Sequence, residues 1–68
     1  MSEHIYKMIE IVGTSKKGSD DAIKQAIEKA SASLHNLDWY EVQEIRGHIV
    51  DGKIDHYQVK LKVGFRLD

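Results

Sequence analysis

A tryptophan and a glutamine on neighbouring predicted strands have the chemistry to bind a flat heterocycle. Trp39 is the only tryptophan among the 68 residues, and Gln58 lies on the strand expected to pair with it. An indole face stacks on a planar ring, and a side-chain amide donates and accepts hydrogen bonds at the ring's edge. A second interpretation is that Trp39 and Ile45 pack against a neighbouring subunit. The two are compatible, because a binding site can form where subunits meet.

The elements that must position these side chains form a β-hairpin around Asp51-Gly52. This dipeptide favours a two-residue type I′ turn, in which both central residues have positive φ. We therefore predict one strand over residues 39–50 and a second over residues 53–67. Alternate residues of the second strand are apolar and are expected to face a helix: Tyr57, Val59, Leu61, Val63, Phe65 and Leu67.

A two-residue turn fixes which residues lie opposite each other across the hairpin. Trp39 is predicted opposite Gly64 and Ile45 opposite Gln58, all on the face turned away from the helix. Trp39 then has an open platform beside it, because glycine has no side chain. This face is therefore the predicted ligand or interface surface.

The same register predicts two charged side chains on the helix side of the sheet. It sets Arg46 opposite Tyr57 and Glu44 opposite Val59. Charges in a half-buried position need partners. We therefore expect these two residues to form an ion pair within the chain or between subunits.

The N-terminal half predicts one strand and one amphipathic helix. Residues 4–12 are typical of a strand, and residues 13–18 of a polar loop. Ser19 is the expected helix N-cap, followed by Asp20 and Asp21 in the first turn. Apolar residues then recur at helical spacing as far as Leu34. The predicted fold class is α+β, a β-α-β-β single domain over residues 1–68 with a predominantly antiparallel sheet.

Composition excludes several classes of function. Ten basic and eleven acidic residues give a net charge of −1, which disfavours nucleic-acid binding. Cysteine is absent, so disulfides, thiol catalysis and cysteine-bound metals are excluded. No signal peptide or membrane-spanning stretch is recognised, so we expect a cytoplasmic protein with no membrane partner. A domain this small buries only about 60% of its unfolded surface, which favours oligomerisation.

Eight short segments, in this order and spacing, resemble the dodecins, small flavin-binding proteins of bacteria and archaea. The match runs over essentially the whole chain without gaps and is closest to the bacterial branch. The segments begin at His4 (HIYK), Ile11 (IVGTS), Asp21 (DAI), Asn36 (NLDW), Glu44 (EIRG), Asp51 (DGK), Tyr57 (YQV) and Lys62 (KVGF).

The resemblance implies a hollow homo-dodecamer in which each sheet partly wraps around its helix. It implies oxidised flavin, FMN or riboflavin, stacked in antiparallel pairs between tryptophans at two-fold interfaces. The matching residues are Trp39 for stacking and Gln58 for the edge of the flavin ring. The implied role is storage and photoprotection without catalysis, the tryptophan quenching the excited flavin by electron transfer. Some bacterial members also bind coenzyme A at separate sites.

Two further residues are candidates for contacts with the flavin. Arg46 could neutralise the FMN phosphate at a subunit boundary, as an alternative to the ion pair. Asp38, just before Trp39, could accept a hydrogen bond from the ribityl chain, as an alternative to a role in the turn.

The histidines and hydroxyl residues are not expected to form a reactive site. The predicted register sets His48 opposite Asp55 and points His48 and His56 to opposite faces, so these two should not bind one metal ion. The serines and threonine have no recognisable base to activate them. Neither a catalytic residue nor a metal ligand is therefore predicted.

Overall fold

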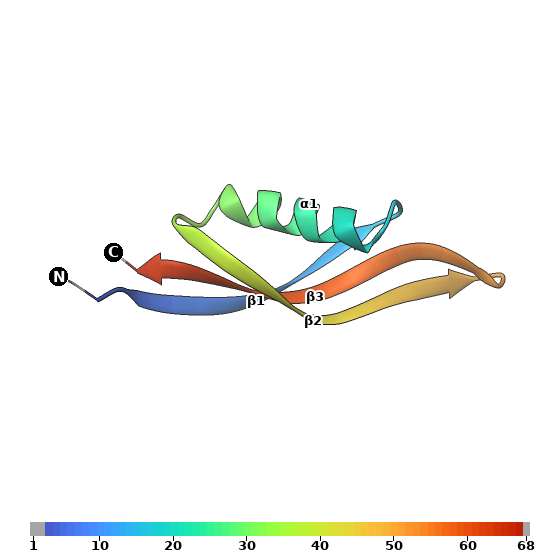
Figure 1. Cartoon of the computed structure of the whole chain (residues 1–68). Helices are drawn as coiled ribbons and strands as arrows, with labels where there is room; N and C mark the ends of the chain where they lie inside the picture. The colour runs from blue at the N-terminus through green and yellow to red at the C-terminus, as the bar shows by residue number, and fades with distance from the viewer. Residues whose placement is uncertain (1–2, 68) are drawn as a thin grey trace.

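The computed structural model describes residues 3–67 and has the predicted β-α-β-β order. Strand β1 spans Ile5–Ser15, helix α1 Ser19–Ser31, strand β2 Leu37–Val50 and strand β3 Lys53–Leu67 (Figure 1). Strand β1 therefore continues three residues beyond the predicted end at Val12. The helix begins at Ser19 with Gly18 at the N-cap, so the prediction of Ser19 as the cap is wrong. It ends at Ser31, before Leu34, the last of the apolar residues predicted to recur at helical spacing.

Strand β3 is the centre of the sheet. The strand order is β1-β3-β2, and both neighbours run antiparallel to β3. Three side chains of β3, Val59, Leu61 and Val63, are fully buried together with Ala22 of α1. Because side chains alternate across a strand, the residues between them point away from the helix. We call this surface the outer face, which on β3 carries Gln58, Lys60, Lys62, Gly64 and Arg66.

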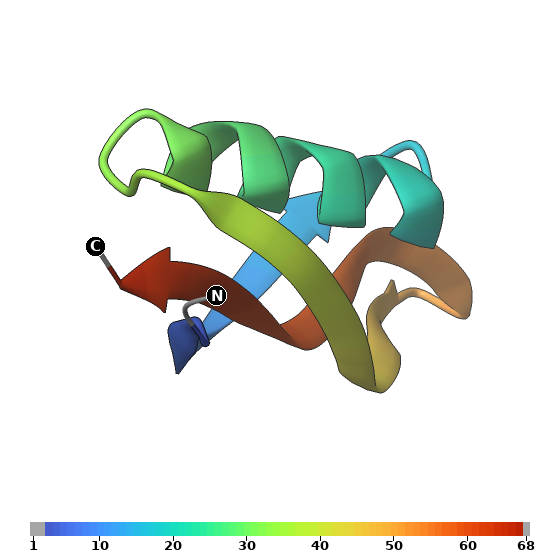
Figure 2. The same ribbon diagram turned by 60° about the vertical axis from the view of Figure 1, so that its left-hand side comes forward.

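The sheet is longer than the helix and curls around it. Figure 2 shows β2 crossing beside α1 while β3 bends beneath it. The far end of the β2–β3 hairpin extends past the helix as an arm (Figure 1), and the chain measures 56 × 20 × 13 Å along its principal axes. The arm carries exposed apolar side chains, among them Ile49, Val50 and Ile54. Within residues 3–67, α1 packs on β1 and β3 and leaves the arm uncovered.

The turn of the hairpin is as predicted. Asp51 has a φ of 52° and Gly52 a φ of 75°. Both values lie in the left-handed region that a type I′ turn requires. The two-residue connection therefore sets the register that starts at the pair Val50 and Lys53.

An extra residue in β2 changes the predicted register in the middle of the hairpin. Pairing follows the prediction from Trp39 to Val42, shifts by one residue before Glu44, and returns to the prediction at Ile49. Such a β-bulge inserts one residue into one strand and reverses the faces of those that follow it. The predicted partners of Glu44 and Arg46 are therefore wrong, and both side chains lie on the outer face, opposite Lys60 and Gln58.

A serine and an aspartate connect the end of β1 to the start of α1. Ser15 is buried, and its Oγ donates a hydrogen bond of 2.6 Å to Asp21 Oδ2. The same Oγ accepts the Lys17 backbone N–H at 2.9 Å. Gln25 also donates to the Asp21 carboxylate. These hydrogen bonds, that from Ser15 first, hold the pKa of Asp21 below its ordinary value.

No helix within residues 3–67 combines the length and apolar character needed to cross a membrane.

The lowered pKa of Asp21 predicts a pH-dependent contribution to folding stability. The carboxylate stabilises the folded state fully above the unfolded-state pKa, near 3.8, and this contribution is lost as the pH falls through the lower pKa of the folded state. Asp21→Asn should therefore lower the urea unfolding midpoint at neutral pH, and the difference from wild type should disappear in acid. Asp20→Asn is the control, because it removes a charge from the same turn without breaking these hydrogen bonds. An equal effect of the two variants at every pH would contradict the role of Asp21.

Candidate ring-binding surface

Trp39 lies on the outer face against a glycine of the central strand. It pairs with Gly64, as predicted. A Cβ atom at position 64 would lie only 2.4 Å from carbons of the indole ring. Glycine therefore makes room for the indole itself, and the predicted open platform beside Trp39 is occupied by its own ring. The residue is still 40% exposed, which leaves part of the ring available for stacking.

A tyrosine of β1 also contacts the indole. The ring centroids of Tyr6 and Trp39 are 5.1 Å apart at an interplanar angle of 66°, an edge-to-face contact. Tyr6 reaches this position because it pairs with Arg66, two residues from Gly64 along β3. Sequence reasoning missed Tyr6, because β1 and β3 are far apart in the chain and no tight turn between them fixes their register. The sequence signal that could have found Tyr6 is the alternation of side chains along this strand, which places His4, Tyr6 and Met8 on one face.

Gln58 also lies on the outer face, where Arg46 holds its side chain. Arg46 Nε donates a hydrogen bond of 3.0 Å to Gln58 Oε1. A guanidinium nitrogen of Arg46 lies 3.3 Å from Glu44 Oε1, so the predicted ion pair is present within the chain. The amide is thereby oriented, and its NH₂ group and the second lone pair of Oε1 stay available to a ligand. Both members of the ion pair are about half exposed, so the pair itself adds little stability.

Trp39 and Gln58 do not meet within one chain. Trp39 pairs with Gly64, which is six residues from Gln58 along the same strand. At roughly 3.3 Å per residue, this separation is about 20 Å. The prediction that the two side chains lie on one face is confirmed. The two side chains are nevertheless too far apart to contact one flat ring within one chain.

The remaining candidates occupy different surroundings. Ile45 pairs with Val59, not Gln58, because of the bulge, so its predicted place on the outer face is wrong. It lies instead on the same side of the sheet as the buried Val59 and is 62% exposed. Asp38 is the extra residue at a second irregularity of β2, between Leu37 and Trp39. With Asn36 and Arg66 it lines a polar depression of about 160 Å³, and sequence reasoning did not select Arg66.

The two histidines of the arm lie on the same face, contrary to the prediction. The bulge pairs His48 with His56, and their rings stack with centroids 5.1 Å apart. Across residues 3–67, the structure contains no group of three or more metal-binding side chains.

Comparison with known proteins identifies a family that fits this fold. The model of the dodecin family matches residues 5–68. A dodecin of Thermus thermophilus is 50% identical over 64 residues, covering 94% of this chain and 93% of the relative. The solved structure of the Streptomyces davaonensis dodecin superposes with a TM-score of 0.95 at 58% identity, covering 98% of each chain. The Streptomyces coelicolor dodecin gives a TM-score of 0.95 at 51% identity, covering 100% of this chain and 97% of the other.

The contact between Trp39 and Gly64 predicts a specific effect of a single methyl group. Gly64→Ala should lower the free energy of unfolding by about 1–3 kcal/mol, because the new Cβ overlaps the indole. It should also shift Trp39 fluorescence to longer wavelength as the ring moves into solvent. Gly18→Ala is the control for the emission of Trp39, because a Cβ there meets nothing within 4 Å. Its stability is not compared, because Gly18 is the N-cap of α1 and alanine is unfavourable there. Unchanged stability and emission in Gly64→Ala would show that the indole does not occupy this space.

Proposed function

Since the chain belongs to the dodecin family, we propose that it binds an oxidised flavin, FMN or riboflavin, and stores it without catalysing a reaction. The observation that carries the proposal is the position of Trp39. Its indole is seated over Gly64 on the face that α1 leaves uncovered, and 40% of the residue is exposed. An exposed aromatic face fixed by its neighbours is suited to stacking on the flat isoalloxazine ring.

The second part of the proposal is that each site needs two copies of the chain. A single flavin ring cannot touch both Trp39 and Gln58 of one copy across about 20 Å. If two copies meet by their outer faces about a two-fold axis, the tryptophan of one approaches the glutamine of the other. The Gln58 amide then forms hydrogen bonds with the edge of the flavin ring that stacks on the partner's Trp39.

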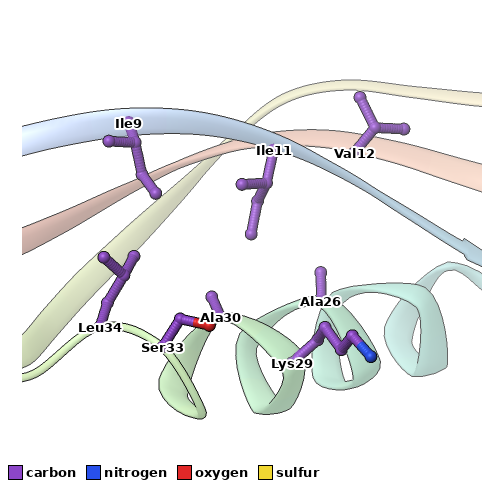
Figure 3. Close-up of a pocket in the computed structure, with 8 residues that line it drawn as sticks. All are labelled: Ile9, Ile11, Val12, Ala26, Lys29, Ala30, Ser33 and Leu34. Carbon is purple, nitrogen blue, oxygen red and sulfur yellow. The ribbon is translucent and has the colours of Figure 1, made fainter.

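Self-assembly is supported by apolar surfaces that one chain leaves uncovered. Ile49 and Ile54 on the arm and Ile45 beside it are 59–71% exposed. A groove of about 310 Å³ lies between β1 and α1, where Ile9 and Ile11 point toward Ala30 and Leu34 (Figure 3). A second copy of the chain is the proposed occupant of these surfaces, since the family is expected to form homo-dodecamers. Burial of such patches is a strong driving force for association.

Arg46 is proposed to act by positioning Gln58. Its guanidinium group is already bonded to Gln58 and Glu44, so the charge is partly compensated within the chain. The alternative, in which Arg46 neutralises the FMN phosphate, predicts an effect on FMN alone. Asp38 lies beside Trp39 and is the candidate acceptor for the ribityl hydroxyls.

The proposed role is storage of flavin and protection from light. A flavin stacked on an indole loses its excited state by fast electron transfer, which prevents photochemistry. A ring enclosed between an indole and a second flavin also leaves little space for a hydride donor. Binding of coenzyme A at a separate site stays a prediction from the family resemblance, as does a cytoplasmic location.

Flavin titration of Trp39 variants tests the stacking role. Trp39→Ala should weaken riboflavin binding by about tenfold or more, because an aromatic pair contributes about 0.5–1.5 kcal/mol beyond the buried area. Flavin fluorescence, quenched in wild type, should return in this variant. Trp39→Phe should keep part of the affinity and lose most of the quenching, because phenylalanine is a poor electron donor.

The matched control for these variants is Tyr40→Phe, which alters the neighbouring aromatic side chain and keeps the indole. It should bind and quench like wild type. Binding and quenching by Trp39→Ala at the level of wild type would contradict the proposal.

Comparing FMN with riboflavin separates the two roles of Arg46. Arg46→Ala should weaken binding of both flavins to a similar extent, because the Gln58 amide loses its orienting hydrogen bond. Arg46→Lys keeps the charge but lacks the planar guanidinium group with its N–H donors, so it should behave like Arg46→Ala. A loss confined to FMN, with rescue by lysine, would instead assign Arg46 to the phosphate.

A further inference from the structure

A pair of histidines lies on the outer face of the arm, next to the pair of Arg46 and Gln58 and nearer the turn. His48 of β2 and His56 of β3 are directly opposite each other on the outer face, and their rings are stacked at an angle of 16°. Directly opposed residues have Cβ atoms about 4.5–5.5 Å apart, so the two side chains can reach one common point. Both belong to paired strands of the hairpin, beside the register shift between His48 and Ile49.

A carboxylate orients one ring of this pair. His56 Nδ1 lies 2.8 Å from Asp55 Oδ2, which fixes the proton on Nδ1 and leaves Nε2 as a free acceptor. The hydrogen bond to His56 is the largest cause of a lowered pKa of Asp55, and the charge of Lys16 also contributes. In metal centres, a histidine ligand usually donates its second N–H to a carboxylate in this way, which raises the basicity of the ligating nitrogen.

We propose that His48 and His56 together bind a divalent transition-metal ion, with Asp55 as the residue that orients His56. Neutral imidazole is a favoured ligand of Zn²⁺ and Ni²⁺. The lone pairs converge if the His48 ring rotates about its side-chain bonds while Asp55 holds His56. His48 is exposed and has no hydrogen bond within residues 3–67 to oppose this rotation. Water or a neighbouring copy supplies the remaining ligands.

Zn²⁺ titration of the assembled protein tests the proposal. The protein should carry no histidine tag and should first be treated with a chelator. Wild type should bind Zn²⁺ saturably, with at most one ion per chain, and His48→Gln and His56→Gln should each abolish this binding. Asp55→Asn should lower the affinity about tenfold or more, as for other residues that support a metal ligand. His35→Gln is the control, because this exposed histidine is distant in the sequence from His48 and His56 and should not affect binding.

Two further measurements add thermal stability as a second readout and Ca²⁺ as a second ion. Zn²⁺ should raise the Tm of wild type with increasing ion concentration, because an ion that binds only the folded state stabilises it. Ca²⁺, which takes oxygen ligands, should give no effect that depends on His48 or His56. Saturable Zn²⁺ binding that survives in both histidine variants, or a wild-type Tm that Zn²⁺ does not raise, would overturn the proposal.

Discussion

The packing of β3 under α1 is the constraint on which the rest of the molecule depends. Val59, Leu61 and Val63 are fully buried against Ala22, and β3 is hydrogen-bonded on both sides. Once these three side chains face the helix, alternation forces Gln58 and Gly64 to face outward. The outward glycine admits the indole of Trp39, and the outward glutamine receives Arg46. The proposed binding surface is therefore a direct consequence of how the core is filled.

Sequence patterns predicted the parts of the structure that depend on strong local signals. Asp51-Gly52 located the turn, and the alternation of β3 placed Trp39 and Gln58 on one face. The bulge after Val42 was not predicted, because no glycine or proline marks it. Its physical reason is visible in Glu44 and Arg46, which an unbroken register would turn toward the helix side. The bulge moves both charges to the outer face, and the same shift brings His48 opposite His56.

The small size of the core connects folding to assembly and to ligand binding. Only a few side chains within residues 3–67 are fully buried, and large apolar side chains are exposed along the arm. A chain of this kind gains most of its remaining burial from other copies of itself. If flavin binds where two copies meet, it stabilises the same contacts that complete the fold. Assembly and flavin binding should then strengthen each other.

The central claim is that one flavin site takes Trp39 from one copy and Gln58 from another. Its most direct test is to unfold Trp39→Ala and Gln58→Ala chains, mix them, refold them together, and titrate riboflavin while following fluorescence. Each variant assembled alone should bind weakly, since every site lacks one of the two side chains. The mixed assembly should regain tight, quenching sites, because some interfaces combine an intact tryptophan with an intact glutamine. A mixed assembly that binds no better than the separate variants would contradict the account and place both side chains of a site in one chain.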